Sequence, residues 1–178
     1  MQRWLVTVLF SSTLAAAVAL AGDGGQAGRY MEVEDYLAST FPDGAPAAST
    51  LWVSGDIRES VEQVLGHRFG KLRTRYWFNG ETSVWVLDEI GKELPITIGV
   101  AVRHGQIADI KVLEFRESRG WEVKYPFFTD QFKDAKMAGD NRLDRDIDSI
   151  TGATLSVGAV TRIAKVALIL HDNIQKPS

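Results

Sequence analysis

Two tight turns in the middle of the chain constrain its fold more than any other feature. Asn79-Gly80 separates the segments RYWF (75–78) and TSVWVLDE (82–89), and His104-Gly105 divides the β-branched run 96–115 into two. A two-residue turn of this kind between strand-like segments is the strongest local signal for a hairpin, because its central residues adopt positive φ angles. Three or four consecutive strands joined in this way form an antiparallel sheet.

A long amphipathic segment closes the chain. From Leu155 to Ile174, apolar residues recur at helical spacing and no proline interrupts them. Such a helix is long enough to cover one face of the sheet. We therefore expect an α+β fold, in which an antiparallel sheet of hairpin-linked strands is packed by helices and a long C-terminal helix follows the last loop. The expected apolar stripe comprises Val160, Ile163, Ala164, Ala167, Leu168 and Leu170.

Shorter helices are expected on either side of the sheet. Residues 30–41 predict a short helix, and the Pro- and Gly-containing segment 42–50 predicts a loop. Asp56 with Glu59 three residues later has the pattern of a capping box, and Gly66 is a natural helix end. We therefore expect a helix with Asp56 as its N-cap.

A last short helix is expected over 129–136, capped by Thr129 or Asp130. Several large aromatic side chains flank or interrupt the predicted strands, and we expect them to pack on the buried face of the sheet. They are Trp77, Trp85, Phe115 and Trp121.

Composition excludes several kinds of site. The 178 residues include no cysteine, which excludes disulfides, iron–sulfur clusters, CxxC-attached haem and a cysteine nucleophile. His67, His104 and His171 are too scattered to form a typical ligand pair, so we expect no metal site. The formal net charge is −3 and no basic tract is present, which argues against nucleic acid as a partner. A redox role would therefore need an organic cofactor.

The first residues have the character of a targeting segment. Residues 1–21 contain Arg3, an apolar stretch of 18 residues and the small-residue ending Ala19-Leu20-Ala21, which fits a cleaved signal peptide. The alternative is an uncleaved membrane anchor, because the stretch approaches the length of a membrane span. In either case we expect the remainder to be exported. The Gly-rich residues 22–28 predict a flexible linker, and 29–178 a single domain.

The segment DSITGAT (148–154) lies just before the predicted C-terminal helix and contains none of the usual nucleophiles or bases. The start of a helix presents free backbone N–H groups and the positive end of the helix dipole, which favour a phosphate. Gly152 and Ala153 leave space for a large group to approach. The alternative interpretation is an ordinary turn with a Thr or Ser N-cap. Polar groups around this point come from Asp148, Ser149, Thr151 and Thr154.

The same segment matches the pattern D-x-x-[ST]-G-A-T, and by this motif the chain resembles the FMN-binding domain family. That family includes the flavin-bearing subunits of the sodium-pumping NADH:quinone oxidoreductase and of Rnf-type complexes. The resemblance implies that FMN is joined through a phosphoester to Thr154, and that a Mg-dependent flavin transferase takes the FMN from FAD. It extends over roughly residues 80–170.

Two weaker similarities accompany the motif. ESRG (117–120) resembles the family's E-T-P-G turn, with Arg119 in place of proline, and KELPITIGVAV (92–102) resembles the family's strand that begins GPI. The resemblance implies that FMN binds among residues of the motif and of this turn. The expected FMN-binding residues are Thr154, Asp148, Ser149, Thr151, Gly152, Ala153, Glu117, Ser118, Gly120 and Trp121. We expect Glu117 to act as a hydrogen-bond acceptor, and Trp121 either to stack on the flavin or to pack in the core.

Three classes of function remain open from the sequence. The first is an exported electron-transfer protein with covalent FMN, no catalytic side chain of its own, and membrane or periplasmic redox proteins as partners. It would lie in the periplasm or on the outer face of the cytoplasmic membrane. The second is an exported flavin-dependent reductase acting on a small acceptor, and the third is a ligand-binding or sensory module without a redox role.

Overall fold

The computed structural model describes residues 27–139 and 141–175, and six strands within them form one antiparallel sheet. The sheet order is β1-β6-β5-β4-β3-β2. This confirms the predicted α+β class and both hairpins. The predicted targeting segment 1–21, and the predicted linker except its last two residues, lie outside the described residues. The strands are β1 (Gly28–Arg29), β2 (Ala48–Trp52), β3 (Arg73–Phe78), β4 (Thr82–Ile90), β5 (Pro95–Arg103) and β6 (Gln106–Phe115).

Only the β5–β6 turn has the two positive φ angles that both turn sequences predict; in the β3–β4 turn, Gly80 has a φ of 97° but the φ of Asn79 is not positive. In the β3–β4 turn, the side-chain oxygen of Asn79 accepts hydrogen bonds from the backbone N–H groups of Glu81 at 3.1 Å and Thr82 at 2.8 Å. In the β5–β6 turn, His104 and Gly105 have φ angles of 50° and 72°, as a type I′ turn requires. These local interactions set the register of β3 with β4 and of β5 with β6.

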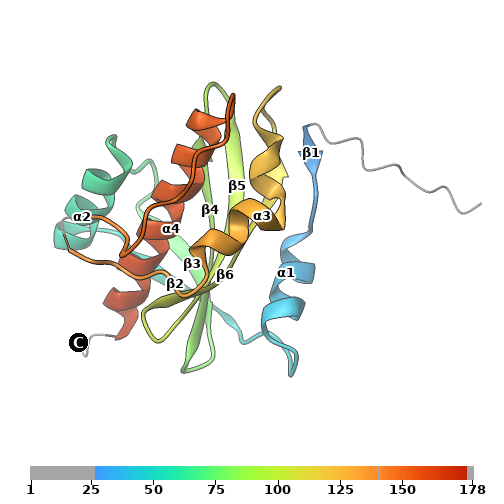
Figure 1. Cartoon of the computed structure of the whole chain (residues 1–178). Coiled ribbons are helices and arrows are strands. Elements are labelled where there is room, and N and C mark those ends of the chain that lie inside the picture. Colours follow the sequence, from blue (N-terminus) through green and yellow to red (C-terminus); the bar gives the residue numbers. More distant parts are fainter. Residues whose placement is uncertain (1–26, 140, 176–178) are drawn as a thin grey trace, which may run out of the picture.

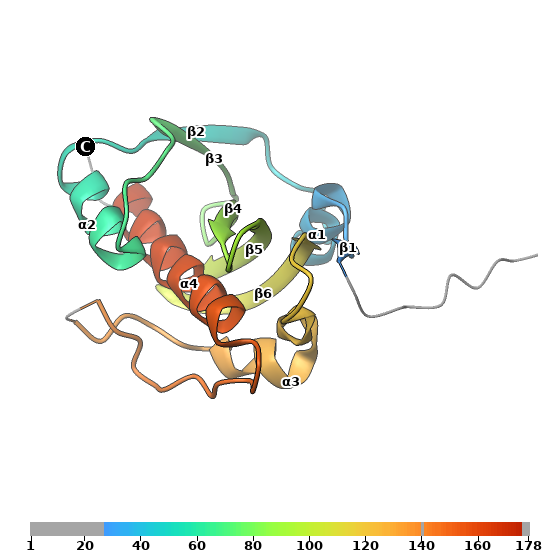
Figure 2. The same cartoon turned by 90° about the horizontal axis from the view of Figure 1, so that it is seen from above.

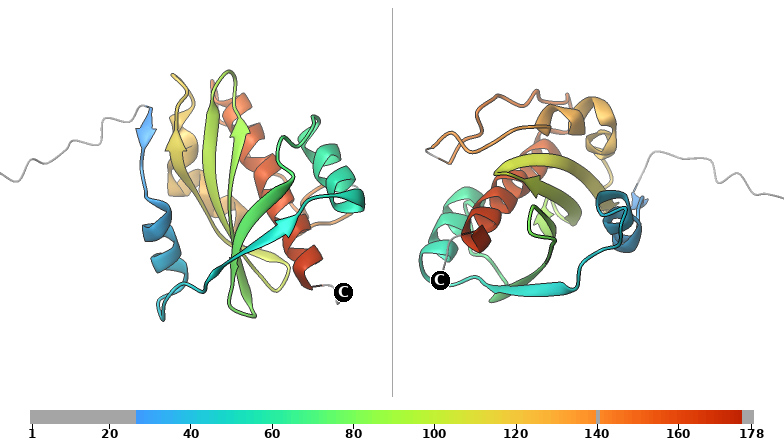
Figure 3. Two further views of the ribbon diagram at one scale, coloured as in Figure 1. Left: turned by 180° about the vertical axis from the view of Figure 1, so that it is seen from behind. Right: turned by 90° about the horizontal axis from the view of Figure 1, so that it is seen from below.

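Helices lie on both faces of the sheet. The long helix α4 (Thr154–Gln175) crosses one face, and α2 (Gly55–Leu65) packs beside it (Figure 1). Seen from above, the sheet curves around α4 (Figure 2). The main core lies between α4 and the sheet, and it contains the predicted apolar stripe of α4 together with Trp85 and Phe115. Seen from behind, the sheet stands in front of α4, with α1 (Val33–Thr40) at its β1 edge (Figure 3).

Two predictions for the N-terminal half are wrong in detail. The predicted loop 42–50 contains the start of β2, an edge strand in which only Leu51 is partly buried, so it lacks the alternating pattern of a half-buried strand. The helix predicted with Asp56 as its N-cap begins two residues earlier, with Ser54 at the N-cap and no side-chain capping bond. Gly66 does end this helix, with a φ of 76°.

Two predictions for aromatic and helical segments also need correction. Trp77 packs on the opposite face of the sheet from Trp85, in a second cluster around Tyr36 of α1, because neighbouring strand positions point to opposite faces. The helix predicted at 129–136 occupies residues 126–132 instead, and its N-cap is Tyr125 rather than Thr129 or Asp130. It consists of α3 (Pro126–Thr129) and the 3₁₀ turn η2 (Asp130–Phe132), which follow a first 3₁₀ turn, η1 (Trp121–Lys124).

The two ends of the molecule carry different connections. The first residues of α4, the β4–β5 turn at 91–94 and the segment that follows β6 meet at one end (Figure 1). The β3–β4 and β5–β6 turns lie at the other end, near the last residues of α4. The antiparallel topology therefore brings residues 91–94, 117–120 and 152–156 together, although they are far apart in the sequence.

Candidate functional site

A tight turn leads into α4. The backbone N–H of Ala153 donates to the carbonyl oxygen of Ile150 at 2.9 Å, and Gly152, the third residue of this β-turn, has a φ of 83°. A positive φ at that position is the requirement of a type II turn and explains the glycine. Ile150 packs against the main core and anchors the turn. The geometry leaves Thr154 exposed as the first residue of the helix.

The structure excludes the simple capping interpretation of this segment. The first intrahelical bond runs from the N–H of Val157 to the carbonyl of Ala153, so Ala153 occupies the N-cap position. Alanine has no side-chain acceptor, and Thr154 already lies inside the helix. Ala153 therefore cannot cap the N–H groups of the first turn of α4 with its side chain. These N–H groups point toward the end of the molecule where the three connections meet.

Glu117 links two of the three segments that meet at this end of the molecule. Its Oε1 atom accepts hydrogen bonds from the backbone N–H groups of Lys92 at 2.5 Å, Glu93 at 2.6 Å and Leu94 at 2.8 Å. The side chain is buried. Burial raises the pKa of the Glu117 carboxyl, but the three donors outweigh burial and hold the pKa below its ordinary value. The carboxylate thus holds the β4–β5 turn, not the turn in which it lies.

Two glycines allow the connections to pack closely. A Cβ atom at Gly91 would lie 3.1 Å from Oε1 of Glu117. A Cβ atom at Gly120 would lie 2.5 Å from Oγ of Ser156, in the first turn of α4, and Gly120 also has a φ of 89°. Because real Cβ atoms do not approach so closely, glycine is required at position 120 for the turn to rest on the helix.

A cavity of about 590 Å³ opens where these segments meet. This size is in the range of small-molecule and cofactor sites. The cavity brings together five of the residues that the sequence predicted, namely Glu117, Ser118, Gly152, Ala153 and Thr154. The sequence did not predict four further lining residues, which are Lys92, Arg119, Leu155 and Ser156.

The remaining predicted residues do not line this cavity. Gly120 supports it from behind through Ser156. Trp121 is partly buried and packs against the main core, which was one of the two alternatives for this residue. The N–H of Asp148 donates to the side-chain oxygen of Gln131 at 2.7 Å, and the side chains of Ser149 and Thr151 are exposed.

The charges around the cavity favour an anion. Lys92 and Arg119 line it, and the start of α4 contributes the positive end of its dipole. Among the lining residues that the structure describes, Glu117 is the only carboxylate, and it is already occupied by three N–H donors. Lys92 forms an exposed ion pair with Glu93 at 3.1 Å, which in water leaves its charge largely available. These groups fit a ligand that carries a phosphate. The exposed hydroxyl of Thr154 lies beside them at the cavity wall.

The residues that line this cavity lie within a segment that matches a known protein family. The family model of the FMN-binding domain matches residues 91–169. Residues 91–169 form an FMN-binding domain. The protein is accordingly an FMN-binding flavoprotein, which confirms the family that the DSITGAT motif indicated. No protein with a curated description matches the chain.

The family match begins at Gly91 and ends at Ile169, within the extent of 80–170 that the motifs predicted. It contains all three connections that form the cavity and most of α4, whereas α1, β1, α2 and strands β2 to β4 precede it. Lys92 escaped sequence-based prediction because its turn is brought to the motif only by the hydrogen bonds of Glu117. Arg119 was not among the predicted FMN-binding residues because its neighbours in space were unknown.

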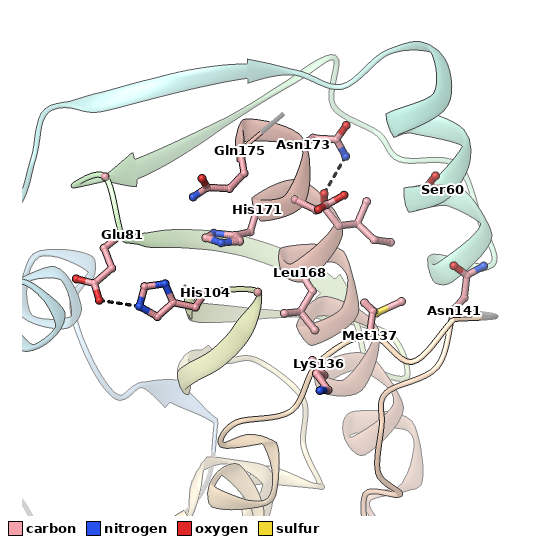
Figure 4. Close-up of a pocket in the computed structure, with 14 residues that line it drawn as sticks. Ser60, Glu81, His104, Lys136, Met137, Asn141, Leu168, His171, Asn173 and Gln175 are labelled. Carbon is pink, nitrogen blue, oxygen red and sulfur yellow. Dashed lines mark hydrogen bonds and ion pairs between the residues drawn. The ribbon is translucent and has the colours of Figure 1, made fainter. Parts of the chain in front are cut away.

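A second cavity lies at the other end of α4 (Figure 4). Its volume is about 750 Å³, and it lies between the two hairpin turns and the last turns of the helix. The ion pair of His104 and Glu81, 2.9 Å apart, stands at its edge. His171 lines it and shares a hydrogen bond of 2.7 Å between its Nδ1 and Oγ of Ser83. This cavity contains none of the FMN-binding residues predicted from the sequence.

Proposed function

We propose that the protein is an exported electron carrier in which FMN is attached covalently to Thr154. The observation that carries the proposal is the position of Thr154. Its side chain is exposed, lies at the first residue of a helix with no side-chain N-cap, and stands in the wall of a cavity lined by Lys92 and Arg119. A phosphate esterified at this hydroxyl would lie where the helix start and both cations favour it.

The attachment step balances with FAD as the flavin donor. The hydroxyl oxygen of Thr154 forms a new bond to the flavin-side phosphorus, the anhydride bond of FAD breaks, AMP leaves, and the hydroxyl proton is released. The family resemblance supplies the catalyst, a separate Mg-dependent flavin transferase. The exposure of Thr154 fits modification by a second protein, since a buried hydroxyl would be inaccessible to it.

Bound FMN would supply reversible one- and two-electron transfer, while the protein sets its position and potential. Glu117 holds the β4–β5 turn in place, Gly120 lets the 117–120 turn rest on α4, and the cations at the rim neutralise the phosphate. Covalent attachment also suits an exported protein, because a dissociable cofactor would be lost outside the cytoplasm.

The predicted targeting segment 1–21 supports export, either to the periplasm or to the outer face of the cytoplasmic membrane. Partners there would be membrane or periplasmic redox proteins. Production of the full chain with its own N-terminus tests this point. The intact mass should correspond to a chain that begins at Gly22 and carries one FMN, whereas retention of residues 1–21 would favour a membrane anchor.

Alternative functions differ from the proposed one in measurable ways. A flavin-dependent reductase for a small acceptor would turn over that acceptor with a reduced donor, while an electron carrier would exchange electrons only with a redox protein. A sensory or ligand-binding module without redox function would show no reversible reduction of its flavin. The match of the FMN-binding domain favours a role for the flavin.

The decisive experiment is in-gel flavin fluorescence after denaturation of protein produced together with the transferase. The native sequence should give a fluorescent band, and Thr154→Val should give none while its circular dichroism remains that of a folded protein. Thr151→Val is the matched control, because Thr151 is exposed in the same turn three residues earlier. A dark band for the native sequence, or an unchanged band for Thr154→Val, would contradict attachment at Thr154.

A further inference from the structure

One side of α4 carries Thr154, Gly158 and Arg162, spaced four residues apart. At 1.5 Å of rise per residue, the eight residues from Thr154 to Arg162 cover about 12 Å along the helix. Gly158 has no side chain, and a Cβ atom placed there would meet only one atom outside the helix backbone within 4 Å, Nη1 of Arg162 at 3.3 Å. The helix therefore presents an uncovered strip of backbone between the predicted attachment point and a guanidinium group.

The guanidinium of Arg162 is held firmly. Its Nε donates to Oε1 of Glu89 at 2.8 Å, and its Nη2 lies 2.8 Å from the same oxygen and donates to the carbonyl of Ile90 at 3.2 Å. Glu89 lies on β4, and its side chain is 3% exposed. Two of the three nitrogens of Arg162 are thus engaged by the end of β4, immediately before the turn that lines the cavity.

The third nitrogen has a different environment. Nη1 of Arg162 has no hydrogen-bond partner among residues 27–139 and 141–175, and it lies over Gly158. Burial of an unpaired carboxylate is costly, so pairing with Glu89 is a sufficient structural reason for the two engaged nitrogens of Arg162. That pairing does not require Nη1 to be directed toward Gly158, the one position on this side of the helix without a side chain.

We propose that Nη1 of Arg162 contacts the polar, pyrimidine end of the isoalloxazine ring of an FMN tethered at Thr154, and thereby raises the midpoint potential of the flavin. The inference rests on the proposed attachment of FMN. The strip over Gly158 admits a flat ring against the helix, and the extended ribityl phosphate accounts for the separation between Thr154 and Arg162. As a hydrogen-bond donor, Nη1 fits a ring carbonyl and the ring nitrogen next to it.

The effect on potential follows from charge. The oxidised ring is neutral, and when it takes up two electrons from dithionite and one proton from water it carries one negative charge on its pyrimidine end. A fixed guanidinium beside that end stabilises the reduced form relative to the oxidised form. Arg162 therefore acts on the redox equilibrium through direct contact with the ring and has no part in the attachment reaction.

The first test measures the midpoint potential of the FMN-loaded protein by equilibration with redox dyes. Arg162→Gln should lower the potential by an amount equal to about a tenfold change in the two-electron equilibrium constant, or ~30 mV. Arg162→Lys should restore part of the shift. Lys165→Gln is the matched control, since it removes a cation from the same helix on the flank that faces Ala138 and residues 142–147. Equal potentials for the native protein and Arg162→Gln would overturn the inference, as would equal shifts for Arg162→Gln and Lys165→Gln.

A second variant leaves the charge of Arg162 in place. Gly158→Leu fills the strip with a good helix-forming residue, so the fold is expected to be retained. Its Cβ atom would lie 3.3 Å from Nη1 at the flexible end of Arg162, which has to shift slightly. It should abolish the visible circular dichroism that a held flavin ring acquires, while the fluorescent band persists. Thr161→Leu adds similar bulk on the other flank of α4 and should leave the signal unchanged. An unchanged signal for Gly158→Leu would show that the ring lies elsewhere.

The proposed attachment of FMN at Thr154 and the proposed role of Arg162 can be contradicted separately. If the native protein carries no flavin after production with the transferase, the proposed function is wrong and the role of Arg162 is wrong with it. If Thr154 carries flavin but the potential and circular dichroism do not respond to the changes at 162 and 158, only the role of Arg162 is wrong.

Discussion

Gly120 rests directly on Ser156. A Cβ atom at position 120 would lie 2.5 Å from Oγ of Ser156 and 3.2 Å from its Cβ, and the φ of Gly120 is 89°. This contact joins the segment after β6 to the first turn of α4, and so fixes the distance between Glu117 and Thr154 across the cavity. Five predictions follow from the packing and charges of this cavity and of the rest of the fold.

Gly120→Ala should destabilise the protein by more than the backbone strain alone. A left-handed backbone costs a non-glycine residue about 1–2 kcal/mol, and the clash with Ser156 adds to that cost. Gly66→Ala is the matched control, because Gly66 has a φ of 76° and open space around it. Urea unfolding should show a larger loss of free energy of unfolding for Gly120→Ala. Equal losses would mean that Ser156 moves aside at no cost.

Glu117→Gln should weaken the β4–β5 turn. Hydrogen bonds to a charged acceptor contribute about 1.5–3 kcal/mol each, so replacing the carboxylate by a neutral amide should lower the free energy of unfolding by an amount of that order at neutral pH. The measurement is urea unfolding monitored by tryptophan fluorescence. Asp148→Asn is a control, since its exposed side chain belongs to the same end of the molecule and forms no such contacts.

The same variant should change the response to acid. The folded-state pKa of Glu117 is lowered, so its stabilising contribution is fully present above the unfolded pKa of about 4.3 and is lost as the pH falls through the lower folded value. The free energy of unfolding of the native protein should therefore fall below pH 4.3 more steeply than that of Glu117→Gln. Parallel curves would show that the three N–H donors do not select the ionised carboxylate.

The pKa values of His67 and His171 should be shifted in opposite directions. Hydrogen bonds to the carbonyl of Arg68 and to Glu89 raise the pKa of His67, whereas burial lowers the pKa of His171. The contribution of His67 to stability is thus present below pH ~6.5 and lost as the pH rises through its raised folded value, and that of His171 is present above pH ~6.5 and lost on acidification. NMR titration of the two rings, assigned with His67→Gln and His171→Gln, should place them on either side of the ordinary value.

Loss of the two cations at the cavity should slow flavin attachment. Lys92→Gln and Arg119→Gln remove charges that would neutralise the phosphate, so labelling by the transferase over a fixed time should fall for each variant and further for the pair. Added salt should reduce the difference between these variants and the native protein. Lys136→Gln removes a cation from the cavity at the other end of α4 and should label like the native protein.

Local sequence signals predicted the elements whose stability depends on their own residues. The two hairpins are set by Asn79-Gly80 and His104-Gly105, and α4 by an apolar stripe that every turn of the helix repeats. Two of the features predicted wrongly depend on distant partners. Strand β2 exists because it pairs with β3, and the face to which Trp77 points is set by the register of its strand.

The candidate site divides in the same way. The attachment motif is contiguous, so its seven residues and the helix that follows could be recognised from the sequence alone. The cavity around it is not contiguous, because Lys92 and Glu117 come from connections about 25 residues apart and Arg119 faces the site only through the turn that Gly120 permits. No spacing along the chain encodes these contacts.

By itself, then, the sequence determined the sheet and the covering helix and led to the prediction that a flavin is joined to Thr154, since turn chemistry, helical periodicity and a short motif act over neighbouring residues. The tertiary structure alone decided what surrounds that residue: the carboxylate of Glu117 engaged by three N–H groups, the cations at the rim, and Arg162 held by Glu89 beside the open face of Gly158. Such arrangements depend on antiparallel pairing and helix packing, which bring distant residues together only when the whole chain folds.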